Sequence, residues 1–276
     1  MSDDEPIAGA GHLGIEVVSG QSAVTSLWAA SPLKILTPRA RGPSVWACLS
    51  TLGGGLVAGD EIAVTLNLSE QARCLLSTQA STKVYRNPNC RPCSHRLRAQ
   101  LGSGSLLAFL PDPVQAFTGS RYRQQQEFSL AAESGLVLVD WLCSGRIARG
   151  ERWAFLRFQS RNEISLGGSR VLVDSLLLDP ADAGRGDCQR MGRFNCLALV
   201  VVIGEPLRAA SAGLLEEIAS LPLPRRAPLV CSASPIAHGA LIRLAGESVE
   251  AVRREIHRLL AFLPQFLHDD PWSRKW

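Results

Sequence analysis

The sequence predicts a mainly β protein: a many-stranded, mostly antiparallel β-sheet domain with two helices near the C-terminus. Throughout the first 205 residues, short apolar or alternating segments follow one another at intervals of about ten residues, with Gly, Pro, Asn or charged turns between them. No helical pattern of about 10–15 residues separates these segments, although a doubly wound α/β fold would require one. Helical periodicity begins only after residue 205.

The clearest strand is EIAVTLNL (61–68), in which apolar and polar residues alternate with a period of two. Similar short runs predict the other strands, bounded by turn residues. These runs are ARCLLSTQ (72–79), SLLAFLP (105–111), QEFSLAA (126–132), GLVLVDWLC (135–143), WAFLRFQS (153–160), RVLVDSLLL (170–178) and a pair of strands around a turn within 227–246.

Two segments have helical periodicity. The first covers residues 206–221 and ends before Pro222. The second covers residues 247–263, with one apolar and one charged face, and ends before Pro264. The tail that follows is polar and contains two tryptophans.

We expect residues 1–276 to form a single domain, with residues 1–20 poorly ordered and residues 247–276 forming a C-terminal helix and tail. The acidic, polar N-terminus does not resemble a secretory signal. The longest apolar run, 196–204, is far shorter than the roughly 20 residues of a membrane span. A net charge of +4 is too small to indicate nucleic-acid binding. These features favour a soluble, cytoplasmic protein that has neither nucleic acid nor a membrane as its partner, with its eight cysteines reduced.

The glycine-rich stretch STLGGGLVAGDEI (50–62) resembles a phosphate-binding loop only superficially. A Walker loop needs Lys followed by Ser or Thr after its last glycine, and then a helix. Here Asp60 follows Gly59, and a strand comes next. The glycines are better explained by a tight turn, which leaves Asp60 and Glu61 either to cap that turn or to supply carboxylates to a polar site.

Hydroxyl and basic residues gather in STQASTKVYRN (77–87), where Ser77 or Ser81 near Lys83 suggests the nucleophile of a serine hydrolase. Such nucleophiles lie on a helix, however, and this region is predicted to be β. A small hydrolase or metal-binding enzyme on a β scaffold is therefore kept as the alternative function.

The segment CRPCSH is the most metal-like local feature, because Cys90, Cys93 and His95 carry ligands suited to zinc, nickel or copper. No second Cys-x-x-Cys pair follows to complete a closed site. The alternative is an exposed loop with incidental cysteines. Asp140 is a separate candidate, because a carboxylate within an apolar run needs a partner or a function.

Six blocks, taken in order, resemble the urease accessory protein UreD (UreH) family over roughly residues 30–276. The chain departs from the family pattern at Gln79, where a proline is common, at the Cys90–His95 insertion, and in the weakly matched region of about 180–245. The blocks are SPLKILTP (31–38), GGGLVAGDEI (53–62), LLSTQASTKVYRN (75–87), LLAFLPDPVQAFTGSRYRQ (106–124), WLCSGRIARGERW (141–153) and PWSRKW (271–276).

The resemblance implies a non-catalytic protein that serves as a nickel metallochaperone scaffold in urease maturation. Its implied partners are UreF, the GTPase UreG and apo-urease, and no cofactor is tightly bound. Nickel would pass transiently along an internal polar path towards urease. The candidate path residues are Asp60, Glu61, Ser81, Lys83, Tyr85 and Asp140.

There are two further expectations. The alternative to a nickel path is a structural role, in which Asp60, Lys83 and Asp140 form a buried ion-pair network that only shapes the core. Trp272 and Trp276 in the tail are expected to bind a partner, because large aromatic side chains are costly to leave in water.

Overall fold

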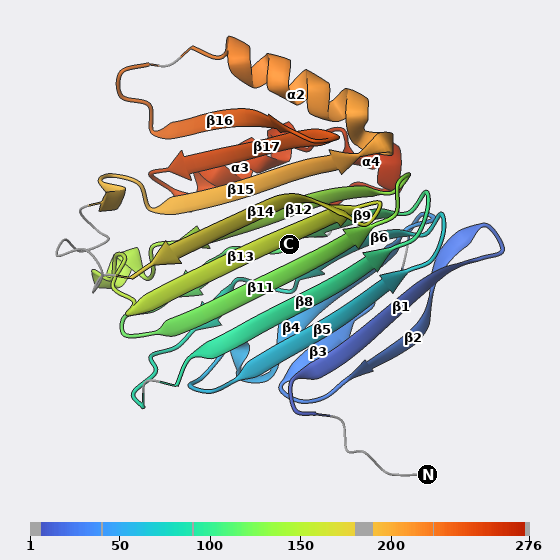
Figure 1. The fold of residues 1–276 in the computed structure, drawn as a ribbon. Helices are drawn as coiled ribbons and strands as arrows, with labels where there is room; N and C mark the ends of the chain where they lie inside the picture. Colours follow the sequence, from blue (N-terminus) through green and yellow to red (C-terminus); the bar gives the residue numbers. More distant parts are fainter. Residues whose placement is uncertain (1–6, 40, 90, 180–189, 223, 274–276) are drawn as a thin grey trace.

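The computed structural model describes residues 7–39, 41–89, 91–179, 190–222 and 224–273. Two β-sheets face each other across an apolar interior, and the seven-stranded sheet lies at the front in Figure 1. In spatial order its strands are β14 (Ser169–Leu178), β13 (Arg157–Leu166), β11 (Arg121–Leu130), β8 (Cys93–Leu101), β5 (Glu61–Leu68), β1 (Ala10–Val18) and β2 (Gln21–Ala29).

The second sheet has ten strands. Its main path runs through β16 (Leu229–Ile236), β17 (Gly239–Gly246), β15 (Cys196–Gly204), β12 (Gly135–Cys143), β9 (Leu106–Leu110), β6 (Arg73–Thr78), β4 (Val45–Thr51) and β3 (Leu33–Leu36). The two short strands β10 (Val114–Ala116) and β7 (Thr82–Val84) extend it beyond β12.

The prediction of mostly antiparallel sheets is wrong. Of the 15 pairings between the described strands, nine are parallel. From β4 to β13 the chain alternates between the two sheets, as in a solenoid, so neighbours within one sheet run in the same direction. The period-two pattern reports which face of a strand is buried and carries no information on which strand pairs with it.

Poor order was expected over residues 1–20, but residues 10–18 form β1. Leu13 and Ile15 of this strand are buried between the sheets. β1 pairs in parallel with β5 and antiparallel with β2, so both of its edges are hydrogen-bonded.

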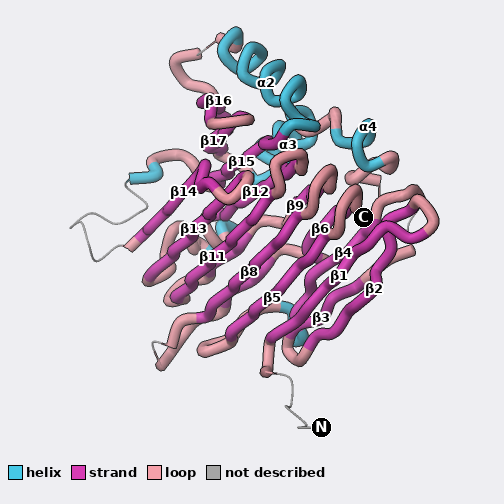
Figure 2. The backbone as a smooth tube through the Cα atoms, turned by 45° about the vertical axis from the view of Figure 1, so that its right-hand side comes forward, coloured by secondary structure: helices cyan, strands magenta, loops and turns pink. Residues whose placement is uncertain are grey.

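Helices cover the outer face of the ten-stranded sheet near β15, β16 and β17 (Figures 1 and 2). They are α2 (Arg208–Ser220), α3 (Val249–Leu259) and α4 (Leu263–Leu267), so the described residues near the C-terminus contain three helices where two were predicted. The side chain of Ser248 caps α3, and the helix stops at Leu259. Pro264 lies in the first turn of α4, where proline is tolerated, so it begins a helix here. None of the helices in the described ranges combines the length and apolar character of a membrane span.

Candidate functional site

The glycine-rich turn lies against the block that carries Lys83 and Tyr85. Leu56 donates its backbone N–H to the Lys83 carbonyl at 2.8 Å, and Tyr85 N donates to the Leu56 carbonyl at 2.9 Å. A Cβ on Gly55 would meet the Lys83 carbonyl oxygen at 2.7 Å, so the two segments approach too closely there for a side chain.

Two more of the family-like blocks meet at the same end of the sandwich. β10 pairs in parallel with both β7 and β12, which places the segment after Pro113 between the block of Lys83 and the block that follows β12. Asn87 N donates to the Gly119 carbonyl at 3.2 Å. Four blocks separated in sequence are therefore neighbours in space.

Asp60 caps the glycine turn. Its carboxylate accepts a hydrogen bond from Val57 N at 2.8 Å, and its backbone carbonyl accepts one from Ser94 N at 2.9 Å. Glu61 is the exposed first residue of β5. The turn-capping role considered for Asp60 from the sequence is therefore present.

The cysteine–histidine segment does not gather a metal cluster within the described residues, where no group of three His, Cys, Asp or Glu side chains is suitably placed. Cys90 lies outside the described residues. The thiol of Cys93 donates to the Val57 carbonyl at 2.9 Å and accepts from Asn87 Nδ2 at 3.3 Å. Burial raises the pKa of Cys93, so this thiol remains protonated and is a poor metal ligand.

His95 lies two residues further along β8 and faces the interior. Its Nε2 atom is fully buried, without a hydrogen-bond partner among the described residues. Burial lowers the pKa of His95 to about 4, so the imidazole is neutral at neutral pH. The ring borders a cavity of about 200 Å³ between the sheets, called here the His95 cavity, which Ser81 also lines.

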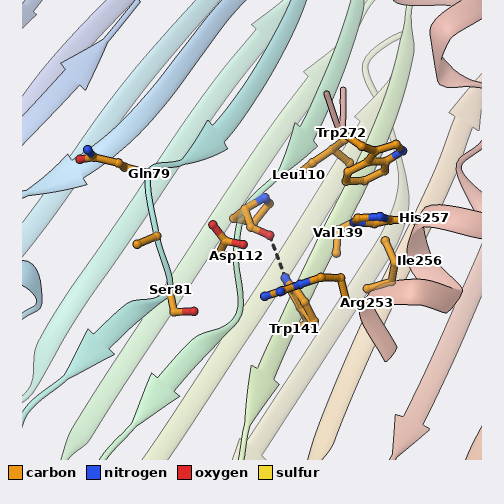
Figure 3. A pocket seen from close by; sticks show the side chains of 12 residues that line it. Gln79, Ser81, Leu110, Asp112, Val139, Trp141, Arg253, Ile256, His257 and Trp272 are labelled. Atoms are coloured by element: carbon orange, nitrogen blue, oxygen red, sulfur yellow. Dashed lines mark hydrogen bonds between the residues drawn. The ribbon is translucent and has the colours of Figure 1, made fainter. Parts of the chain in front are cut away.

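Ser81 also lines a second cavity, of about 380 Å³, on the outer face of the ten-stranded sheet. Figure 3 shows this outer cavity, with Ser81 and Gln79 on one side and Arg253, His257 and Trp272 on the other. Ser81 is therefore in contact with both cavities.

Lys83 and Tyr85 do not face Asp140. Lys83 is exposed, and Tyr85 packs edge-on against Phe117, with 5.5 Å between ring centroids. No ion pair joins Asp60, Lys83 or Asp140 to any group in the described ranges. The proposed buried ion-pair network is thus wrong, because each of the three charges lies in a different environment.

Asp140 projects from β12 into the space between the sheets, where neutral donors from the opposite sheet surround it. Its Oδ1 accepts from Gln124 Nε2 at 2.8 Å. Its Oδ2 accepts from Ser160 Oγ and from Asn162 Nδ2, both at 2.7 Å. The three donors are neutral, and no ion pair joins Asp140 to a cation in the described residues.

A cavity of about 600 Å³, called here the Asp140 cavity, opens beside this carboxylate. It lies between β12, β15, β16 and β17 of the ten-stranded sheet and β13 and β14 of the seven-stranded sheet. Asp174 and Arg243 also line it and form an ion pair of 2.6 Å that joins the two sheets. The polar network continues inward, because Tyr122 Oη donates to Gln124 Oε1 at 3.2 Å. Burial, with a smaller contribution from Asp140, raises the pKa of Tyr122 and keeps it a neutral donor.

Sequence reasoning missed Tyr122, Gln124, Ser160 and Asn162. The signal was present in the even positions of β11, which point inward and include Gln124 and Gln126 as well as Phe128 and Leu130. The predicted strand began only at residue 126, so the inward orientation of Gln124 was not predicted.

Trp272 was expected to bind a partner. In the structure it stacks on His257 of α3, with 3.8 Å between ring centroids and an interplanar angle of 20°. It is half-buried over the outer face of the ten-stranded sheet, so it has an intramolecular role (Figure 3). Trp276 lies outside the described residues.

The fold and this site define a class: a solenoid-like β scaffold with a charged, hydrogen-bonded network in its interior. A family model described as UreD urease accessory protein matches residues 8–276. The chain is 48% identical over 270 residues to a Sorangium cellulosum protein named urease accessory protein UreD, covering 98% of this chain and 85% of the relative. It is 43% identical over 267 residues to the protein of the same name from Anaeromyxobacter sp., covering 97% and 89%. Identity to urease accessory protein D of Arabidopsis thaliana is 31% over 292 residues, covering 95% and 99%.

The chain belongs to the urease accessory protein UreD family. The predicted family is confirmed, and with it the prediction that the chain is not an enzyme, because the matched relatives are named as accessory proteins. The hydrolase alternative is not supported. Ser77 donates its hydroxyl to the Leu110 carbonyl at 2.6 Å, and Lys83 is exposed.

Proposed function

We propose that this chain acts in urease maturation as a non-catalytic scaffold that conducts nickel through its interior towards apo-urease. UreF and the GTPase UreG are its proposed partners. Nickel is a transient cargo of the scaffold and is not a resident cofactor. The names of the relatives support the maturation role, and the single observation that carries the nickel role is the environment of Asp140.

Asp140 is a half-buried carboxylate between the sheets, held by neutral donors. Withdrawing a carboxylate from water, even in part, is costly unless its charge is compensated. Gln124, Ser160 and Asn162 supply hydrogen bonds but no positive charge. A dication arriving beside this group would be attracted to it, and the attraction is stronger in a medium of low dielectric constant than in water.

The network is suited to transfer rather than storage. A closed site with three or four strong ligands would retain the metal, whereas the described residues contain no such cluster. The polar groups instead follow one another between the sheets, from Asp140 through Gln124 to Tyr122. Tyr122 is also in register with Cys93 on β8, near the turn that Asp60 caps.

The test is reconstituted urease maturation with apo-urease, UreF, UreG, nickel and GTP. With Asp140→Asn, we expect nickel incorporation and urease activity to fall about tenfold or more, as the conducting carboxylate is neutralised. Glu127→Gln is the matched control, because Glu127 pairs with Arg98 on the outer face of the seven-stranded sheet. Normal folding, UreF binding and full activation with Asp140→Asn would leave the chain as an interaction module without a nickel role.

Partner binding is measured separately, by pull-down of the chain with apo-urease, UreF and UreG, with and without nickel and GTP. Retention of UreF and apo-urease by the wild-type chain is expected. Failure to retain either one would contradict the scaffold role.

A further inference from the structure

The outer face of the seven-stranded sheet is strongly basic at one end. β8, β11 and β13 run parallel, so their first residues lie together, on the lower left of Figure 1. Buried side chains alternate along these strands with exposed or half-buried ones that point outward. The outward positions among the first five residues of each strand carry only arginine, serine and glutamine. The arginines, called here the arginine patch, are Arg96, Arg121, Arg123, Arg157 and Arg161.

The strand register brings these arginines close together. Arg121 of β11 lies directly opposite Arg157 of β13. Arg96 and Arg161 occupy one row of the sheet, with β11 between their strands. Arg123 lies two residues beyond Arg121 on the same face of β11. Because neighbouring strands are about 4.8 Å apart, roughly 10 Å separates the outermost strands of the patch, which is within the reach of one partner surface.

Local acids compensate only part of this charge. Arg157 lies 3.8 Å from Asp179, and Arg161 pairs with Glu163 at 2.8 Å. The other three arginines of the patch form no ion pair within the described residues. The patch therefore keeps an excess of positive charge on an open sheet face.

This excess is unfavourable for the folded chain alone. Like charges directly opposite each other on neighbouring strands destabilise a sheet, as Arg121 and Arg157 do here. Arg96 and Arg123 are exposed, so neither contributes to the core between the sheets. A surface feature that costs stability and has no packing role is typical of a binding site.

The chemistry of the patch fits the carboxylates of a protein. A guanidinium presents a planar fork of N–H donors that binds a carboxylate or a phosphate through two hydrogen bonds. Further along the same face, Glu127 and Glu163 lie side by side and would repel a phosphate backbone that continued over the sheet. A protein surface can present its own basic residues there. A lipid surface is not favoured, because the outward positions of the patch have no apolar side chain to insert.

We propose that the arginine patch docks an acidic surface of a protein partner in urease maturation. This inference rests on the proposed function for the identity of the partner. Opposite charges on two surfaces accelerate association and make it sensitive to salt, and arginine is enriched at protein interfaces. On β11, Arg123 faces outward whereas Gln124 faces the Asp140 network, so docking and the interior path use opposite faces of one sheet.

The experiment measures binding of the purified full chain to apo-urease, UreF and UreG separately, at low and moderate salt. The patch variant is Arg96→Glu/Arg123→Glu. The control is Arg225→Glu/Arg254→Glu, which changes the net charge equally at exposed positions before β16 and on α3. We expect the affinity for one partner to fall about tenfold or more in the patch variant, and to stay within about twofold of wild type in the control.

Unchanged affinity for all three partners in the patch variant, or equal losses in the patch variant and the control, would overturn the inference. Thermal denaturation checks that both variants are folded. Arg96→Gln/Arg123→Gln removes the charges without reversing them, so it should weaken the same partner by a smaller factor. This milder variant keeps the test decisive if charge reversal disturbs the sheet.

A second probe needs no maturation partner. A glutamate peptide of about ten residues should bind the wild-type chain at low salt and bind the patch variant more weakly than the control. Equal peptide binding in the two double variants would overturn the inference. Tighter binding of oligothymidylate, or of phosphatidylserine vesicles, through the same arginines would also overturn it in favour of a phosphate ligand.

The two probes separate this inference from the proposed function. If the peptide binds through the patch but the wild-type chain retains no maturation partner, the scaffold role fails while the acid-binding surface stands. If the partners bind equally well to the wild-type chain and the patch variant, the inference fails while the scaffold role stands.

Discussion

Asn162 of β13 donates its side-chain N–H to the carboxylate of Asp140 on β12 at 2.7 Å, and this bond joins the two sheets across the interior. The bond fixes the orientation of the Asn162 amide, since its nitrogen must face the carboxylate. Its Oδ1 is consequently turned away and is buried without a partner among the described residues. The same contact therefore joins the two sheets and leaves a polar oxygen, Asn162 Oδ1, buried between them.

Removing this bond should destabilise the fold. For Asn162→Ala we expect a loss of about 1.5–3 kcal/mol in the free energy of unfolding, the contribution of a hydrogen bond to a charged group. Urea denaturation at neutral pH measures it. Gln159→Ala on the outward face of the same strand serves as the control and should change stability by less than about 0.5 kcal/mol. Equal losses in the two variants would contradict the inward role of Asn162.

The close approach at Gly55 predicts a second effect. In Gly55→Ala, the new Cβ would lie 2.7 Å from both the Lys83 carbonyl oxygen and Tyr85 Cε2, so backbone must shift. We expect a loss of about 1–3 kcal/mol in the free energy of unfolding, measured by thermal or urea denaturation.

The matched control is Gly213→Ala in α2, where a Cβ meets nothing within 4 Å. Because alanine has the higher helix propensity, this variant should be more stable than wild type by about 0.5–1 kcal/mol. A stability change of the same sign in both variants would be inconsistent with steric closure at Gly55.

Burial of His95 predicts a dependence of stability on pH. Its pKa is about 4 in the folded protein and about 6.5 in the unfolded chain, so between these values the unfolded state binds more protons. The free energy of unfolding should therefore rise by about 3 kcal/mol between about pH 4 and pH 6.5 because of this group. On acidification from neutral pH, about 2 kcal/mol of this contribution should already be lost at about pH 5. Denaturant titrations at about pH 5 and pH 7 measure the difference, which His95→Leu should reduce and His238→Asn should retain. An identical pH dependence in His95→Leu would show that the ring is not the group responsible.

The stack of Trp272 on His257 predicts that the tail contributes to stability. Trp272→Ala should lower the free energy of unfolding by about 2 kcal/mol, because it removes aromatic contact and part of the cover over the sheet. Trp272→Phe keeps a ring and should lose less. A pull-down of both variants with UreF examines the partner-binding prediction. Unchanged UreF binding by a folded Trp272→Ala protein would confine this residue to its intramolecular role.

Strand positions were largely predictable, because half-buried strands leave a period-two signature. The segments 61–68 and 135–143 correspond to the observed β5 and β12. Pairing was not predictable: β5 lies beside β1 and β8, neither of which is its neighbour in sequence. The site was partly predictable in the same way, since Asp140 stood out as a carboxylate in an apolar run, while its donors on β11 and β13 did not.

The sequence by itself determined the family, the β character, the position of the C-terminal helices and the presence of a charge inside an apolar strand. Each of these depends on local composition, periodicity or ordered motifs. Only the tertiary structure decided that Asp140 is held by neutral groups, that Lys83 is exposed, and that the buried Nε2 of His95, in register with Gln124, has no hydrogen-bond partner among the described residues. These relationships depend on the alternation of strands between two sheets, which brings distant residues within hydrogen-bonding distance and is specified by the packing of the whole chain.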